Sequence, residues 1–145
     1  MGVLIDNKQS SYSVSKQKIR KNAQAVLNAL DSPDAELSIV IVDDKQIAAL
    51  NQTYLNRPGP TNVIAFAMRE GAYADISPEL LGDVVISIET AHRESEAAGI
   101  KPEKRFDQLL VHGILHLFGY NHEADETDAA RMEDKSEELL KLIDT

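Results

Sequence analysis

The segment from residue 112 to residue 122, HGILHLFGYNH, holds three of the chain's four histidines at spacings of four and six residues. Helical residues four apart lie one turn above each other on the same face, so the imidazoles of His112 and His116 can converge on one ion. Gly119 offers the left-handed conformation that ends a helix, and the chain can then turn back to deliver His122. The segment therefore predicts a helix that ends in a metal site.

The ligand set indicates zinc. The chain has no cysteine, so a metal must be held by nitrogen and oxygen ligands, and three neutral imidazoles suit one Zn²⁺ ion. Three protein ligands leave a fourth position for water, which is typical of a catalytic site. A carboxylate from Glu123, Asp125 or Glu126 would instead close the site and make it structural. The sequence alone does not decide between the two arrangements, and it favours the catalytic one with a water in the fourth position.

The residue after the first histidine argues against one class of zinc enzyme. Peptidases with the HExxH pattern carry a glutamate there, which acts as general base toward the metal-bound water. In this chain the position is Gly113. The metal-binding spacing is kept and the peptidase base is absent, so peptide hydrolysis is disfavoured.

Three segments together carry a family resemblance. HGILHLFGYNH is followed by an acidic helix with Met132 and Glu133, and it is preceded by LNQTYLNRPGPTNVIAF at 50–66 and LGDVVIS at 81–87. In order and spacing these segments resemble the YbeY-type single-strand-specific endoribonucleases that mature bacterial ribosomal RNA, over roughly residues 36–143. The resemblance implies zinc ligands at His112, His116 and His122 and a catalytic acidic position at Asp83.

The chain departs from the family pattern at two positions. The family's arginine directly after the tyrosine of the Leu-Asn-x-x-Tyr segment is Leu55 here, and the nearest guanidinium is Arg57. We expect Arg57 to take the catalytic arginine role if the Pro-Gly-Pro turn at 58–60 shifts the loop. The second departure is Asn121, where the family has an aspartate before the last histidine. Asparagine keeps the shape and loses the charge that would orient a ligand imidazole.

The resemblance implies a zinc-dependent endoribonuclease that acts on single-stranded ribosomal RNA in ribosomal RNA maturation and ribosome quality control. The small ribosomal subunit or its proteins are the partners that it implies. A zinc metallopeptidase and a non-catalytic ribosome-associated zinc protein are the alternatives. The sequence leaves open the RNA cleavage site, the oligomeric state, and whether water or the ribose 2′-hydroxyl attacks phosphorus.

The charge distribution bears on RNA as a partner. A net charge of −9 opposes phosphate binding. Two short basic stretches, at 16–21 and 101–105, could nevertheless contact RNA phosphates. The first comprises Lys16, Lys18, Arg20 and Lys21, and the second Lys101, Lys104 and Arg105. Neither a signal peptide nor a membrane-spanning run is recognisable, so we expect a cytoplasmic protein with no membrane partner.

The hydrophobic patterns predict one α/β domain over residues 1–145, a layered fold with a small mixed sheet packed by helices. The zinc site is expected on a helix of the C-terminal half and the turn after it. Strands are expected at 3–6, 36–42, 62–68 and 83–88, and helices at 15–30, after Asp43 or Asp44, at 89–98, 103–118 and 127–143. The helix after Asp44 is expected to turn Ile47, Leu50 and Tyr54 inward.

Overall fold

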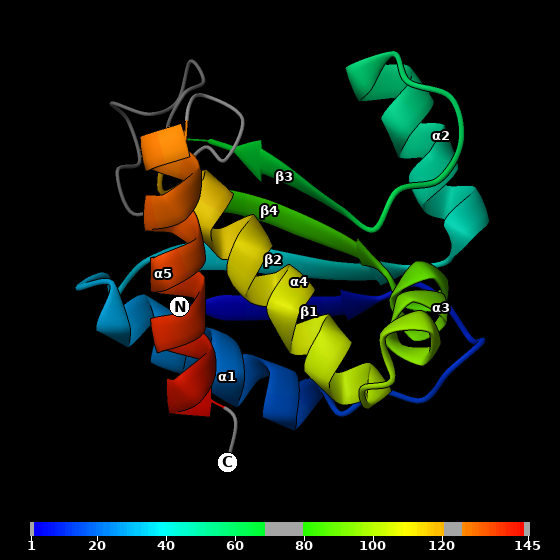
Figure 1. Ribbon diagram of the computed structural model, residues 1–145. Coiled ribbons are helices and arrows are strands. Elements are labelled where there is room, and N and C mark those ends of the chain that lie inside the picture. The colour runs from blue at the N-terminus through cyan, green and yellow to red at the C-terminus, as the bar shows by residue number, and fades with distance from the viewer. Residues whose placement is uncertain (1, 69–79, 121–125, 144–145) are drawn as a thin grey trace.

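The computed structural model describes residues 2–68, 80–120 and 126–143. The described part forms one α/β domain with a four-stranded sheet and five helices, as the hydrophobic patterns predict (Figure 1). In chain order the elements are β1 Val3–Asn7, α1 Lys16–Ala29, β2 Glu36–Val42, α2 Asp44–Leu55, β3 Val63–Ala67, β4 Leu80–Ser87, α3 Ile88–Ala98, α4 Pro102–Leu117 and α5 Glu126–Ile143. Among these helices none is long and apolar enough to cross a bilayer.

The sheet is mixed, as expected, with strand order β1-β2-β4-β3. Strands β1, β2 and β4 run parallel, and β3 pairs antiparallel with β4. The last strand begins at Leu80, three residues before the predicted start. Since β3 stands at the end of this order, one of its sides faces away from the rest of the sheet.

Helices α1, α4 and α5 cover one face of the sheet (Figure 1). Helix α4 is central, because it packs against β3, β4, α3 and α5. Its apolar positions recur at helical spacing, and Leu110, Ile114 and Leu115 are fully buried. Met132 of α5 is 2% exposed and packs in the same core. The histidine-bearing helix is thus held on several sides by buried apolar contacts.

Helix α2 stands apart from the other helices and packs on the opposite face of the sheet (Figure 1). Its Ile47 is fully buried in a small cluster with Val42, Ile64 and Val85. The prediction that Tyr54 also points inward is wrong, since this residue is 65% exposed. Tyr54 lies in the last turn of α2, where its ring contacts Phe66 edge-on and its remaining surface faces solvent.

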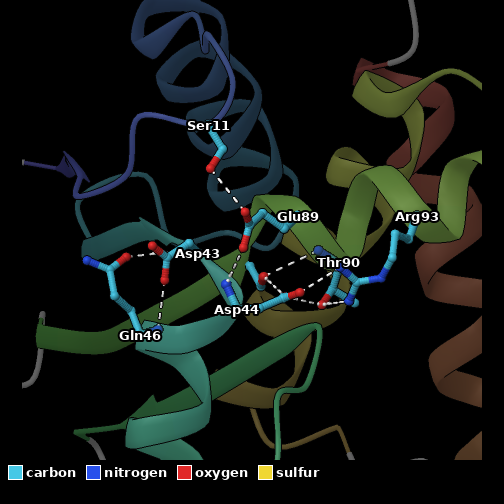
Figure 2. A network of polar contacts seen from close by, with 8 residues as sticks. Ser11, Asp43, Asp44, Gln46, Glu89, Thr90 and Arg93 are labelled. Atoms are coloured by element: carbon cyan, nitrogen blue, oxygen red, sulfur yellow. Dashed lines mark hydrogen bonds and ion pairs between the residues drawn. The ribbon is translucent and has the colours of Figure 1, made fainter.

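A polar network fixes the start of α2 against the start of α3 (Figure 2). The Asp44 carboxylate accepts hydrogen bonds from the Ser87 hydroxyl at 2.7 Å and the Thr90 hydroxyl at 2.6 Å, and it pairs with the Arg93 guanidinium at 2.6 Å. The Asp44 backbone N–H donates to Glu89 at 2.8 Å. Two helices with little shared apolar surface are therefore joined by charge-assisted hydrogen bonds.

The same network lowers the pKa of Asp44. Partial burial by itself would raise this pKa, but the hydrogen bonds from Arg93, Ser87 and Thr90 favour the charged carboxylate and outweigh it. A carboxyl whose pKa is lower in the folded state stabilises the fold above its unfolded pKa, and this stabilisation disappears as the pH falls through the folded pKa. The Asp44 contribution is therefore complete at neutral pH and fades below about pH 4.

We predict that Asp44→Asn lowers the free energy of unfolding by about 2 kcal/mol at pH 7, the range for hydrogen bonds to a charged group. The deficit should shrink below about pH 4, where the wild-type carboxyl takes up a proton. Urea unfolding of the variant and the wild type, from pH 7 to below about pH 4, measures this difference in unfolding free energy. Asp6→Asn is the control, because Asp6 pairs with Lys8 at 3.8 Å with both side chains more than half exposed. A pH-independent deficit in Asp44→Asn would contradict the electrostatic account.

Candidate active site

The site begins with the close approach of α4 to the sheet at Gly113. A methyl group added to Gly113 would lie 2.6 Å from one Val84 methyl and 3.3 Å from a Val63 methyl. These valines belong to β4 and β3, so glycine lets the helix backbone settle onto both strands. A methyl group at position 113 would therefore be directed at these valines, and Gly113 itself provides no general base.

His112 and His116 lie on the neighbouring face of α4, and both are half-buried. Their Nε2 atoms are 3.0 Å apart, and the rings meet at 75°. Two ligands of a tetrahedral zinc ion at about 2.0–2.1 Å would lie about 3.3 Å apart. The pair therefore fits a shared metal ion with a small adjustment of the side chains, as the four-residue spacing predicts.

Helix α4 ends as expected, with Gly119 in a left-handed conformation at φ 96°. The Gly119 N–H donates to the His116 carbonyl and the Tyr120 N–H to the Leu115 carbonyl, each at 3.0 Å, which closes the helix with a Schellman-type turn. The predicted third ligand, His122, lies outside the described residues, as do Asn121, Glu123 and Asp125. Among the described residues, no group of three potential metal ligands comes together.

Arg57 reaches the same place from the other side of β3. Helix α2 ends at Leu55, and Asn56 adopts a left-handed conformation that turns the chain. The turn is held by Asn51, which is 5% exposed. Its carbonyl accepts from the Arg57 N–H at 3.2 Å, and its side-chain amide donates to the Gly59 carbonyl at 3.0 Å. The backbone of Arg57 is fixed, and its side chain is exposed.

A pocket of about 700 Å³ collects these groups at the β3 edge of the described sheet. Its described lining contains both histidines, one arginine and no carboxylate. The described lining residues are Leu55, Arg57, Thr61, Asn62, Val63, Ile64, Ala65, Ala67, His112, Gly113, His116, Leu117, Gly119 and Tyr120. In a chain of net charge −9 this composition favours an anionic ligand.

The structure does not bring Asp83 to this pocket. Side chains alternate between the two faces of a strand, and Val84 faces Gly113 of α4. Asp83 therefore shares the opposite face with Val85, which packs with Ile47 of α2. Asp83 is half-buried and absent from the described pocket lining. The resemblance implies a catalytic acidic position at Asp83, but the structure does not bring this residue together with the histidines.

Two positioning groups were missed by the sequence analysis. Asn51 is one, and a buried asparagine inside a helix is itself a signal, since its amide competes for backbone partners. Glu94 is the other: it accepts from the Asn62 amide at 3.3 Å and from Arg105 at 3.0 Å. This contact ties the start of β3 to α3 and α4. No local sequence pattern reveals Glu94, because its partners are 32 and 11 residues away.

The first basic stretch lies away from the pocket, whereas Arg105 of the second lines a neighbouring pocket together with Asn62, Val63 and His112. Helix α1, with exposed Lys16, Lys18, Arg20 and Lys21, packs beside β1, at the opposite edge of the sheet from β3. Arg105, in the second stretch, is paired with Glu94 and also donates to Gln108. Of the seven basic residues in the two stretches, none lines the described part of the pocket. Arg57 is the cation that does.

Comparison with known proteins identifies the family. The family model described as Endoribonuclease YbeY matches residues 4–144. The chain belongs to the YbeY endoribonuclease family. The match extends the resemblance seen in three segments to nearly the whole chain, and the departures at Leu55 and Asn121 are thus variations within the family.

Individual relatives agree with this membership. Proteins named Endoribonuclease YbeY from Geobacter sulfurreducens and Syntrophus aciditrophicus are 47% and 40% identical to the chain. Each alignment covers 99% of this chain, with 97% and 90% of the respective relative. A solution structure of a Thermotoga maritima protein superposes with a TM-score of 0.69 at 19% identity, covering 97% of this chain and 88% of that one. The last comparison shows a shared fold.

We predict that Gly113→Ala destabilises the protein, although alanine is the better helix former. Overpacking against Val84 costs about 1–3 kcal/mol, and the gain in helix propensity is about 1 kcal/mol. A net loss of up to about 2 kcal/mol in unfolding free energy is expected. Val84→Ala makes room for the new methyl group, so the double variant should cost less than the sum of the single variants. Additive losses would show that the contact with Val84 is not the cause.

Proposed function

We propose that this chain is a zinc-dependent endoribonuclease that cuts single-stranded RNA in the pocket at the free edge of β3. The observation that carries the proposal is the meeting of two converging imidazoles and one arginine in a pocket whose described lining has no carboxylate. A pocket with an arginine, metal-binding imidazoles and no carboxylate suits a phosphate group. Family membership supports RNA as the source of that phosphate.

His112, His116 and His122 would hold the zinc ion. The 3.0 Å separation of the first two Nε2 atoms fits the donor set, and His122 is carried over from the family motif. Bound there, zinc would supply a water molecule with a pKa near 7 and a positive charge beside a phosphoryl oxygen. The half-buried imidazoles would be fixed by α4, which the core holds in place.

Arg57 would bind and orient the scissile phosphate. Its guanidinium can pair with two phosphate oxygens at once and can stabilise the additional negative charge that develops in the transition state. The rigid turn held by Asn51 keeps the backbone of Arg57 fixed, while the exposed side chain is available to the substrate. Arg57 would thus replace the family arginine that is absent at Leu55.

The substrate would be ribosomal RNA, cut during maturation and quality control of the ribosome in the cytoplasm. Family membership supports this. A chain at −9 can make few phosphate contacts of its own. The small ribosomal subunit or one of its proteins would help to hold the RNA. A peptidase is not supported, since Gly113 stands where the HExxH pattern has its general base.

We predict that His116→Ala abolishes stoichiometric zinc binding and RNA cleavage together. It should also remove the rise in melting temperature that added zinc gives the wild type, because metal binding stabilises the folded state. Elemental analysis and thermal unfolding with and without zinc measure both effects. His92→Ala is the matched control, since His92 stacks on Tyr12 and is not among the described lining of the pocket. Stoichiometric zinc in His116→Ala would sink the ligand assignment.

We predict that Arg57→Ala slows cleavage of single-stranded RNA by about 10²–10³-fold, the range for loss of one transition-state hydrogen-bond donor. Zinc content and melting temperature should stay unchanged, because the side chain is exposed. Arg57→Lys should recover part of the rate, since lysine keeps the charge and loses the paired donors.

Two further variants sharpen the Arg57 test. Leu55→Arg in the Arg57→Ala background restores the family arrangement and should regain activity. Neutralising Lys16, Lys18, Arg20 and Lys21 should leave the rate near that of wild type, because α1 lies at the other edge of the sheet. The reverse pattern, with Arg57→Ala fully active and the α1 variant inactive, would move the phosphate site to α1.

A further inference from the structure

The free edge of β3 presents a regular row of backbone groups. In an antiparallel pair, alternate residues direct both N–H and C=O toward the partner strand. The Met68 N–H donates to the Leu81 carbonyl and the Ser87 N–H to the Asn62 carbonyl, each at 3.0 Å. Even-numbered residues of β3 therefore bond to β4. By the same register, the N–H and C=O groups of Val63, Ala65 and Ala67 point away from β4.

These three residues line the pocket that holds the histidines and Arg57. Among the described residues no other strand pairs with β3 on this side, since β3 ends the sheet order. The side chains at 65 and 67 are single methyl groups, which leave the backbone accessible. Within the described part of the chain, one wall of the pocket is thus a ladder of unpaired donors and acceptors. The other wall carries the imidazoles of α4.

Unpaired nucleobases fit such a ladder. The Watson–Crick edge of each base carries a hydrogen-bond donor beside an acceptor, and proteins read single-stranded RNA on these edges. One outward residue of an extended strand likewise offers an N–H and a C=O in the same direction. In a duplex the same base edges are already hydrogen-bonded to the complementary strand, so a base-paired RNA cannot bond to β3 through them.

We propose that the outward backbone groups of Val63, Ala65 and Ala67 bind Watson–Crick edges of unpaired bases and thereby make the site selective for single-stranded RNA. This proposal rests on the proposed ribonuclease function. It adds that the pocket recognises the unpaired Watson–Crick edges of the substrate. An extended peptide would use the same edge by strand addition. RNA is favoured because the described lining has an arginine and no carboxylate.

Methylated substrates test the proposal directly. A single-stranded oligouridine RNA would be compared with the same RNA made of N3-methyluridine, which blocks the Watson–Crick edge, and of 5-methyluridine, which carries its methyl on the other side of the ring. We expect kcat/KM to fall about tenfold or more with N3-methyluridine, for the loss of one or two hydrogen bonds per base, and to hold with 5-methyluridine. Equal cleavage of the two methylated RNAs would overturn the proposal.

A variant of the strand gives the complementary test. Ala65→Pro removes an outward N–H and leaves the hydrogen bonds to β4 in place, as proline does on an edge strand. It should lower kcat/KM for unmodified RNA about tenfold and have a much smaller effect on the N3-methylated RNA, which has already lost the contact. Ala65→Ser keeps the N–H and is the control. If Ala65→Pro does not fold, the methylated substrates decide alone.

The possible failures are distinguishable. If wild type cuts none of the RNAs, the ribonuclease function itself fails. If wild type cuts unmodified, N3-methylated and 5-methylated RNA alike, the ribonuclease function is supported and the proposed recognition of base edges by β3 is wrong. Binding of an extended peptide that is lost in Ala65→Pro, together with equal cleavage of the methylated RNAs, would assign the edge to a peptide and overturn the proposal.

Discussion

The contact between Gly113 and Val84 determines how the rest of the site is arranged. A helix approaches a sheet this closely only where the facing residue has no side chain, because even a methyl group would lie 2.6 Å from a valine methyl. Valine has a stiff side chain that cannot turn away at low cost. The approach brings α4 against the edge strand β3 as well as β4. The two imidazoles of α4 therefore lie beside the free sheet edge, where a long ligand can reach them.

The opposite side of the pocket depends on how α2 is held. This helix shares a small apolar cluster with the sheet, and polar contacts at both of its ends complete its attachment. The Asp44 network joins its first turn to α3, and Asn51 holds the turn that follows its last residue. The placement of Arg57 thus rests on two polar groups that are satisfied within the protein. Asn51 is buried and Asp44 is partly buried, and such groups specify one geometry, since any other would leave them unpaired.

The electrostatic design is local. A chain with a net charge of −9 repels polyanions at long range, and the exposed lysines and the arginine of α1 lie at the other edge of the sheet. The described lining of the pocket carries one arginine and no acid. On its other side His112 borders a second pocket with Arg105, Glu133 and Glu137. The first of these pockets selects its anionic ligand by short-range contacts within the pocket. Long-range electrostatic attraction of the ligand contributes little. This is consistent with a substrate that other macromolecules help to deliver.

The sequence by itself determined the class of fold, the order of the elements and the pairing of His112 with His116. These properties follow from local periodicity: apolar residues recur at helical or alternating spacing, Asp43 caps α2, and Gly119 ends α4 where its left-handed conformation is allowed. The tertiary structure decided what depends on contacts between distant segments. It exposed Tyr54, because the last turn of α2 lies beyond the apolar cluster, and it turned Asp83 to the far face, because Val84 had to meet Gly113. It also brought Arg57 and the free edge of β3 beside the histidines, a juxtaposition of segments about 50 residues apart that no local pattern encodes.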